Sequence, residues 1–296
     1  MVVPAYNEAK NLPLLLFKID NSFKKNKING EVVLVDDGST DNTKEVTIEL
    51  RKKYRFLKAI RHEVNRGLTN ALITCFKNST GQIIIFLPAD LESNPEEDIP
   101  KLLNKLNEGY DMVCGWRQKR KGIKKISSNI YNMLSRLLFG INIHDLNWIK
   151  AFKREVIKDI RLRSDWHRYL AILAKSEGYR IGEVKVNAYK RKYGKSKFGI
   201  SRLFIGIIDL LVVKFHLSFI DKPMLLLSSL GVVLLILAFF GGVYLLIIKI
   251  MTGVLGNRIP LFFLVVVLII LGIQLFALGF LAELLVTMNE RINKNK

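Results

Sequence analysis

The stretch IIIFLPADLESNPEE, Ile83 to Glu97, decides the fold of this chain. Five large apolar residues, Ile83 to Leu87, stand between a glycine and a proline, which is the pattern of a strand buried on both faces of a parallel sheet. Asp90 and Glu92 follow, and ligands of open α/β sheets bind where strands end. Two carboxylates there suit a hard divalent cation that holds a diphosphate. They could equally well serve only to cap a helix beginning near Pro95.

The residues on either side of this stretch alternate between strand and helix patterns. Further strands are expected at residues 1–4, 31–35, 56–61 and 111–114, and helices at residues 11–24, 43–54, 68–78 and 96–107. Beyond these, HDLNWIKAFKREVI predicts a strand, a turn and a helix start, followed by a helix at 166–177 and an edge strand at 180–188. This alternation indicates an α/β domain with a parallel sheet wrapped by helices.

Two long apolar runs, Met224 to Ile248 and Leu261 to Met288, stand near the end of the chain. Each is long enough for a helix to cross a hydrocarbon core of about 30 Å. The turn between them carries little positive charge, whereas the flanking segments are basic, so the positive-inside tendency puts the α/β domain and both termini in the cytoplasm. The sequence therefore predicts an integral membrane protein of a prokaryotic plasma membrane or, in a eukaryote, of the endoplasmic reticulum.

Two basic amphipathic segments precede these runs. RQKRKGIKK leads into a helical pattern with Ile130, Met133 and Leu137 on one face, and residues 201–219 form a second such helix. Basic amphipathic helices are typical of membrane surfaces, although the first could instead pack on the domain. We expect three parts: an α/β domain at 1–200, a juxtamembrane helix at 201–222 and a two-helix anchor at 223–296.

The charge of the chain points to anionic partners. The net charge is +20, of which +17 lies on residues 1–222. A basic domain on a membrane anchor suits lipid head groups, a lipid phosphate or a nucleotide diphosphate, and the apolar runs argue against nucleic acid. The two cysteines, Cys75 and Cys114, stand in apolar surroundings and are expected to be buried free thiols.

Four motifs, VVPAYNEA, VLVDDGSTDNT, NRGLTNA and LPADLESNPE, occur in this order, each at an expected strand end. Together they resemble glycosyltransferase family 2, which has a Rossmann-like GT-A fold. The segment HDLNWIKAFKREV, the residues from Trp166 to Phe215 and the two apolar runs are similar to the polyprenyl-phosphate glycosyltransferases of the dolichyl-phosphate mannose synthase type, which have a two-helix anchor. The resemblance covers nearly the whole chain.

This resemblance implies a reaction. A single sugar would move, with inversion at the anomeric carbon, from a UDP- or GDP-sugar to a dolichyl or undecaprenyl phosphate at the cytoplasmic membrane face. It implies Mg²⁺ or Mn²⁺ as cofactor, and the nucleotide-diphosphate sugar, the polyprenyl phosphate and the lipid bilayer as partners. Self-association into a homo-oligomer is left open.

The resemblance also implies which residues bind the donor. The nucleotide would be held by Pro4, Ala5, Tyr6, Glu8, Asp37, Gly67 and Asp90. Asp37 would bind the nucleoside while Asp36 supports the turn, and Gly67 would let the backbone approach the nucleotide. Asp90 and Glu92 would hold the metal on the diphosphate and so improve the leaving group.

Two of the motifs depart from the family pattern. Pro88 stands where the metal motif usually has its first Asp, and Glu92 stands where Gln is common. Leu68 replaces the usual Lys of the third loop, so Arg66 is the nearest substitute charge. These changes leave the preference for a metal, and the need for one, open.

Acceptor residues follow from the same resemblance. Asp145 would orient the acceptor or the sugar, because a lipid phosphate is already ionised and needs no strong base; alternatively, it caps the next turn. Arg117, at the end of its strand, would meet the acceptor or donor phosphate. Four further basic residues are candidates for drawing phosphates to the membrane surface: Arg136, Lys195, Lys197 and Arg202.

Two other functions stay open at this point. A processive polysaccharide synthase needs more spans and a QxxRW signature, neither of which the sequence contains. A non-catalytic membrane scaffold would have kept the fold and lost its chemistry through Pro88. Product analysis distinguishes the synthase, which makes a polymer, from a transferase that adds one sugar per lipid. A scaffold is distinguished by a failure to bind UDP- or GDP-sugars.

Overall fold

A computed structural model describes residues 1–118, 132–160, 162–163, 166–191, 193, 201–219 and 223–294 of the chain, without the side chains of 201–207 and 289–294. The chain forms two compact units, Met1–Ile207 and Ile208–Lys296. We describe each unit separately below.

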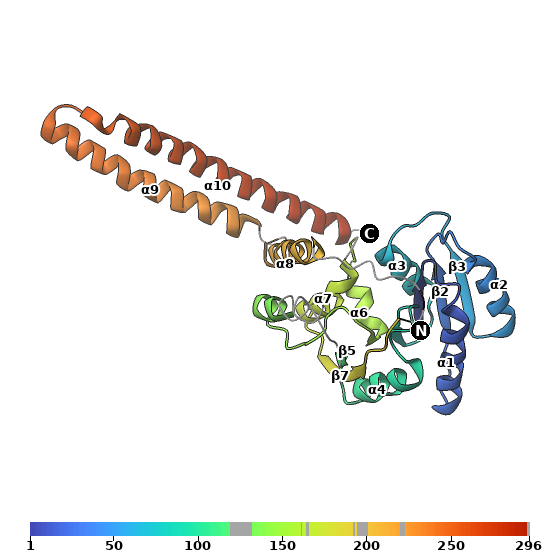
Figure 1. The fold of residues 1–296 in the computed structure, drawn as a ribbon. Helices are drawn as coiled ribbons and strands as arrows, with labels where there is room; N and C mark the ends of the chain where they lie inside the picture. Colours follow the sequence, from blue (N-terminus) through green and yellow to red (C-terminus); the bar gives the residue numbers. More distant parts are fainter. Residues whose placement is uncertain are drawn as a thin grey trace. The chain divides into compact units, whose positions relative to one another are not determined.

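The first unit contains a seven-stranded sheet and its covering helices (Figure 1). The strands are β1 (Val2–Ala5), β2 (Val32–Asp36), β3 (Leu57–Arg61), β4 (Ile83–Phe86), β5 (Met112–Gln118), β6 (Lys150–Lys153) and β7 (Ile181–Asn187). The helices are α1 (Leu12–Lys25), α2 (Thr43–Lys53), α3 (Leu68–Asn78), α4 (Pro95–Asn107), α6 (Arg154–Asp159), the 3₁₀-helix η1 (Trp166–Tyr169) and α7 (Leu170–Ser176). Residues 132–139 are also helical.

The sheet is mixed, with the order β3-β2-β1-β4-β6-β5-β7. All neighbouring strands are parallel except at β6, which runs antiparallel to both β4 and β5 and places Lys150 opposite Phe86. The predicted parallel arrangement therefore holds for the other six strands, and β6 is the exception. Because β6 runs antiparallel to β5, it starts from the edge of the sheet at which β5 ends. Strand β7 lies at the edge of the sheet, as predicted.

Helices cover both faces of this sheet. Helices α1, α2 and α4 pack on one face and α3 and α7 on the other. Residues at helical spacing on α1, such as Leu12, Leu16 and Ile19, are completely buried. The strand pattern of β4 is only partly confirmed: Ile84 and Ile85 are buried, but Ile83 is 37% exposed because it lies at the open amino edge of the sheet. The order of the elements positions the ends of β1, β2, β4, β5 and β7 along one edge.

Both cysteines are free and buried, as predicted. Cys75 lies on α3 and Cys114 on β5. Burial raises the pKa of each thiol to about 12, so both stay protonated at neutral pH. They are therefore packing residues of the core.

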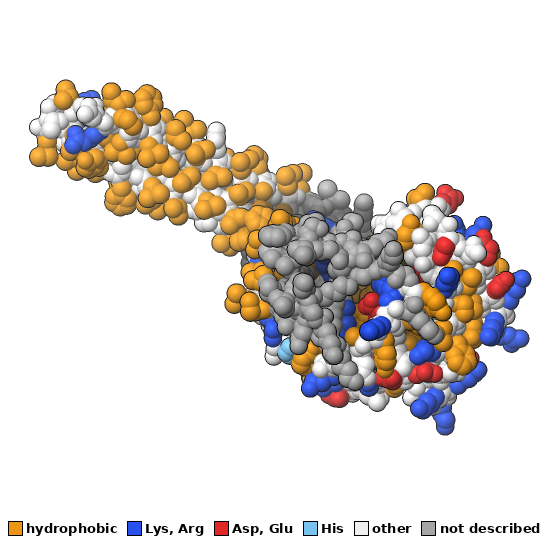
Figure 2. Space-filling view, viewed as in Figure 1, with side chains coloured by type: hydrophobic (Ala, Val, Ile, Leu, Met, Phe, Trp, Pro, Cys, Tyr) orange, Lys and Arg blue, Asp and Glu red, His pale blue; other side chains and the backbone are white. Residues whose placement is uncertain are grey.

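The second unit contains two long apolar helices, α9 (Pro223–Thr252) and α10 (Ile259–Lys294), joined through the short 3₁₀-helix η2 (Gly256–Arg258). Both are long and apolar enough to cross a membrane, and hydrophobic side chains cover most of their surface (Figure 2). They pack closely where Gly231 faces the backbone of Gly272, because a Cβ on Gly231 would lie 2.6 Å from the Gly272 oxygen. Helix α8 (Ser201–Phe219) has the predicted bounds and crosses the border between the units.

Candidate active site

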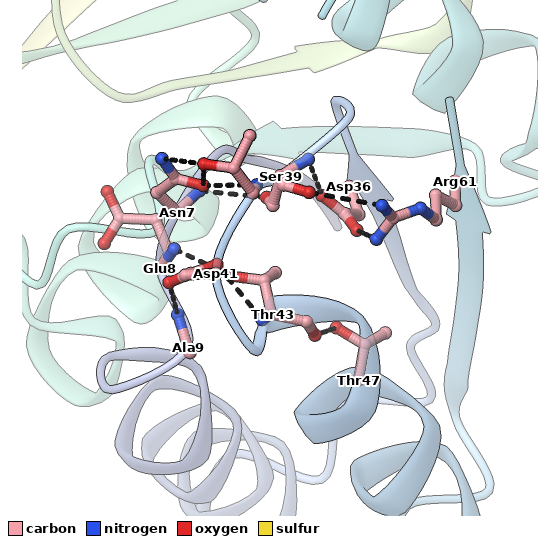
Figure 3. Close-up of polar contacts among 10 residues, drawn as sticks. Asn7, Glu8, Ala9, Asp36, Ser39, Asp41, Thr43, Thr47 and Arg61 are labelled. Carbon is pink, nitrogen blue, oxygen red and sulfur yellow. Dashed lines mark hydrogen bonds and ion pairs between the residues drawn. The ribbon is translucent and has the colours of Figure 1, made fainter. Parts of the chain in front are cut away.

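The loops that follow β1 and β2 are fastened to each other at the carboxyl edge of the sheet (Figure 3). Asn7 adopts a left-handed conformation with φ 57°, and its side-chain oxygen accepts a hydrogen bond of 2.8 Å from the backbone N–H of Thr40. The N–H of Asn7 donates to Ser39 Oγ at 2.9 Å, and that of Glu8 donates to Thr43 Oγ1 at 3.0 Å. The two loops therefore form one frame, with few backbone donors left unpaired.

Asp36 stabilises the turn after β2. Its carboxylate accepts hydrogen bonds from the N–H of Ser39 at 3.0 Å and from Nη1 of Arg61 at 2.7 Å, as Figure 3 shows. Gly38, which follows, has φ 70°, and a Cβ there would lie 2.4 Å from the carbonyl carbon of Val64. Only glycine satisfies both the conformation and the close approach. Asp36 thus has the supporting role expected for it.

Asp37 is 3% exposed and fastens the loop that opens α3. Its carboxylate lies 2.7 Å from Nδ1 of His62 and accepts the backbone N–H groups of Arg66 at 3.0 Å and Gly67 at 2.8 Å. His62 did not figure among the predicted residues, although it directly follows β3, and its position at a strand end could have identified it. The nucleoside contact of Asp37 stays a prediction.

Gly67 is the residue that caps the amino end of α3. Its φ of 85° is a backbone conformation that residues other than glycine rarely adopt. A Cβ built there meets no atom of the described residues within 4 Å, so the space over Gly67 is open among them. The structure brings Gly67 and Asp37 together through a hydrogen bond. This is compatible with the predicted approach of a ligand to the backbone at Gly67.

The two carboxylates after β4 are held by one arginine. Asp90 Oδ1 accepts the N–H of Glu92 at 3.1 Å, and the intervening Leu91 adopts φ 58°, so the two carboxylates converge. Arg191 Nη2 donates to Asp90 Oδ2 at 2.6 Å, and its Nε lies 3.4 Å from Glu92 Oε1. Sequence reasoning missed Arg191, because it stands in a basic run where nothing distinguishes it from its neighbours.

Glu8 connects this cluster with the frame formed by the first two loops. Burial raises the pKa of its carboxyl group, a hydrogen bond from Asn11 opposes that shift, and the charge of Asp90 raises the pKa further. The positive charge of Arg191 also acts on Glu8. Glu8, Asp90, Glu92 and Arg191 therefore form one electrostatic group at the carboxyl edge of the sheet.

The donor set of this cluster fits a divalent cation bound together with phosphates. Within the described residues, no group of three or more His, Cys, Asp or Glu side chains could enclose a metal by itself. Mg²⁺ is commonly held by only one or two carboxylates together with substrate phosphates and water. Asp90 and Glu92 supply two converging carboxylates of the required hard oxygen type.

The two predicted catalytic residues, Arg117 and Asp145, bind each other. Nε of Arg117 lies 2.5 Å from Asp145 Oδ2 and Nη2 lies 2.9 Å from Oδ1, with both side chains less than a tenth exposed. The guanidinium also lies over the ring of Trp148, at 4.3 Å from its centroid. Lys150 is buried nearby, and burial lowers the pKa of its ammonium group. This cluster is therefore a largely buried arrangement of charges.

The remaining predicted residues are distributed as follows. Pro4 and Ala5 lie within β1 itself, buried, and Tyr6 is partly exposed directly after it. Arg136 lies on the helix at 132–139 and is partly exposed. Arg202 belongs to α8, but its side chain is not described, and Lys195 and Lys197 lie outside the described residues.

Comparisons with known proteins agree with this geometry. The chain is 32% identical over 96% of its length to dodecaprenyl-phosphate galacturonate synthase of Rhizobium johnstonii, covering 86% of that protein. It is 31% identical, again over 96% of its length and 86% of the relative, to undecaprenyl-phosphate 4-deoxy-4-formamido-L-arabinose transferase of Proteus mirabilis. A solved structure of glucosyl-3-phosphoglycerate synthase of Mycobacterium tuberculosis, in complex with Mn²⁺, UDP-glucose and phosphoglyceric acid, has the same fold. Its TM-score is 0.55 at 18% identity, with 73% of this chain and 78% of that chain covered. The family model described as glycosyl transferase family 2 matches residues 1–166, and the chain belongs to this family.

Proposed function

We propose that this protein transfers a single sugar from a UDP- or GDP-sugar to the phosphate of a membrane polyprenol, with inversion at the anomeric carbon. The observation that carries the proposal is the carboxylate pair Asp90 and Glu92 at the end of β4, beside the fastened loops of a family 2 transferase. The names of the two curated relatives support a polyprenyl phosphate as the acceptor.

The donor nucleotide binds over the loops that follow β1, β2 and β3. Pro4, Ala5 and Tyr6 lead into this frame and Glu8 continues it. The backbone at Gly67 lies open to a nucleotide, because no atom of the described part of the chain stands within 4 Å of its Cβ position. Asp37 fixes that backbone from beneath and contributes to holding the nucleoside.

Asp90 and Glu92 hold Mg²⁺ or Mn²⁺ against the donor diphosphate. The bound cation neutralises charge on the leaving nucleotide diphosphate. The complex of the Mycobacterium tuberculosis enzyme with Mn²⁺ and UDP-glucose supports a divalent metal in this fold. Glu92 and Asp90 are oriented by the turn at Leu91, so the chain places both ligands without the carboxylate that Pro88 replaces.

The acceptor phosphate meets basic residues. Nη1 of Arg117 takes no part in the hydrogen bonds to Asp145, so it is the N–H group of that pair left for a phosphate oxygen, while Asp145 holds the guanidinium in place. Arg136, Lys195, Lys197 and Arg202 attract phosphates to the membrane surface. The apolar helices α9 and α10 anchor the protein in the bilayer, with the transferase unit and both termini in the cytoplasm.

The test uses the full chain in lipid vesicles that contain undecaprenyl phosphate. A panel of radiolabelled UDP- and GDP-sugars is supplied with Mn²⁺. The lipid products are separated by chromatography, and their masses are determined by mass spectrometry. We expect one donor to yield one sugar per lipid. A polymeric product would instead support a processive synthase, and failure of every nucleotide to bind would support a scaffold.

A further inference from the structure

Arg191 makes a contact that the sequence analysis did not predict. It follows β7, near the end of the first unit, yet its guanidinium contacts both carboxylates that follow β4. The side chains of Asp90 and Arg191 are 11% and 27% exposed, so the contact is partly shielded from water. It joins two loops that lie side by side at the carboxyl edge of the sheet.

This contact uses one oxygen atom of each carboxylate, Asp90 Oδ2 and Glu92 Oε1, to which a metal could also bind. Asp90 Oδ1 accepts the N–H of Glu92, and Asp90 Oδ2 accepts Nη2 of Arg191. The nearest Glu92 oxygen also faces Nε of Arg191, at 3.4 Å. A divalent cation that binds both carboxylates therefore competes with the guanidinium for them.

The backbone that carries Arg191 is held independently of its side chain. The N–H of Tyr189 donates to the carbonyl oxygen of Glu92 at 2.9 Å, and the Tyr189 hydroxyl donates to Glu97 Oε1 at 2.7 Å. Asn187 Nδ2 donates to the other Glu97 oxygen at 3.2 Å. The guanidinium can therefore leave the carboxylates while the loop stays fastened to the start of α4.

A guanidinium binds carboxylates and phosphates with the same planar, forked geometry. Once a divalent cation neutralises Asp90 and Glu92, it repels Arg191, and the donor diphosphate supplies the nearest new anion. We propose that Arg191 holds these two carboxylates in the free protein and transfers its guanidinium to the donor diphosphate when metal and nucleotide bind. The inference rests on the proposed metal site, and it makes metal and nucleotide binding cooperative.

The experiment measures Mn²⁺ binding to the full-length protein in detergent by electron paramagnetic resonance of free Mn²⁺. Titrations are made with Mn²⁺ alone and with UDP or GDP present, allowing for the manganese–nucleotide complex in solution. For the wild type we expect the better nucleotide to tighten Mn²⁺ binding by about 5- to 150-fold. In Arg191→Gln, Mn²⁺ alone should bind about tenfold more tightly, and the nucleotide effect should shrink to about threefold or less.

Lys190→Gln is the matched control, because Lys190 is exposed, forms no ion pair among the described residues and carries the same charge one position away. It should behave like the wild type. Arg191→Lys, which keeps the charge and loses the fork, should shift Mn²⁺ binding in the same direction by less, and it serves as the test should Arg191→Gln fail to fold.

The inference is overturned if the Arg191 variants bind Mn²⁺ alone no more tightly than the wild type while the nucleotide still tightens it. It is also overturned if Lys190→Gln gives the same shift as Arg191→Gln, since the effect would then be one of net charge. Absence of Mn²⁺ binding to the wild type, with either nucleotide, would instead overturn the metal site of the proposed function and the inference with it.

Discussion

The two groups of loops at the carboxyl edge of the sheet hold their carboxylates in different ways. Asp37 accepts backbone N–H groups of Arg66 and Gly67, which cannot leave without rearranging the loop. Asp90 instead has as its main partner a side chain, that of Arg191. The first region is therefore held by backbone groups that fix its shape, whereas the second is held by a side chain that, in our proposal, a cation displaces.

The ion pair of Arg117 and Asp145 shares a feature with each region. Like the contact of Asp90 it joins two side chains, and like Asp37 it is buried. The largest expected effect concerns this pair. Asp145→Asn removes a negative charge that Arg117 and buried Lys150 both experience, and breaking a buried pair costs about 3–5 kcal/mol of unfolding free energy. Thermal unfolding of the purified protein measures the loss.

The control for that prediction is the double variant Arg117→Met, Asp145→Leu, which removes both charges. It should recover most of the stability, because no uncompensated partner is left at this position. If Asp145→Asn alone lowered the unfolding free energy by less than about 1 kcal/mol, the pair would contribute no more than an exposed ion pair and would resemble the contact of Arg191.

The next effect is on turnover. Asp90→Asn should lower the rate of sugar transfer by about 100- to 1,000-fold, or about 3–4 kcal/mol of activation free energy, as expected when charge stabilisation is lost. Its unfolding temperature should change little, because the contact it loses is with a partly exposed side chain. Glu96→Gln removes a carboxylate from α4 outside the cluster and should preserve turnover. Full activity of Asp90→Asn would count against the carboxylate cluster as the metal site.

The frame around Asp36 gives a smaller effect. Gly38→Ala combines φ 70° with a Cβ 2.4 Å from backbone carbon, and we expect a loss of about 2–3 kcal/mol in unfolding free energy. Gly67→Ala also has positive φ but meets no atom of the described chain within 4 Å, so it should cost only about 1 kcal/mol. Chemical unfolding curves compare the two, and equal losses would show that the loops near Gly38 are less tightly packed than described.

The smallest effect depends on pH. Burial raises the pKa of Asp98, at the start of α4, from 3.8 to about 6, although the N–H of Asn94 opposes the shift. The folded protein therefore binds this proton more tightly, and the stability that it contributes is present below pH 3.8 and lost as the pH rises through about 6. Between pH 5 and 7 the loss is about 1 kcal/mol.

Asp98→Asn cannot titrate and should lack this loss. The difference in unfolding temperature between variant and wild type should therefore shift in favour of the variant as the pH rises from 5 to 7. A difference that is constant with pH would mean that Asp98 is ionised across the whole range.

Much of this fold could be predicted from the sequence, because burial patterns are local. Helices α3 and α8 have the predicted bounds, α1, α2 and α4 differ by one residue at their ends, and the helix predicted at residues 166–177 has a 3₁₀ start. Helices α9 and α10 extend four and six residues beyond the carboxyl ends of the two apolar runs. The direction of β6 could not be predicted. It depends on where the chain returns after β5, and no residue in β6 records that path.

For the candidate site, the sequence predicted where residues lie in the fold better than it predicted which side chains contact one another. The strand-end rule pointed to Asp90, and the family resemblance pointed to Asp37 and Gly67, but neither revealed that Asp37 faces His62. Neither could select Arg191 among the five basic residues of YKRKYGKSKFG. Which of several similar side chains reaches a carboxylate is decided by the tertiary fold.

The most direct test is to locate the metal in a crystal of the full-length protein with Mn²⁺ and UDP or GDP, from the anomalous scattering of manganese. We predict a peak in coordination contact with Asp90 and Glu92 and with the diphosphate oxygens, with the Arg191 guanidinium turned from the carboxylates to the diphosphate. Manganese bound elsewhere, or a diphosphate bound with Arg191 still on Asp90, would contradict this description of the site.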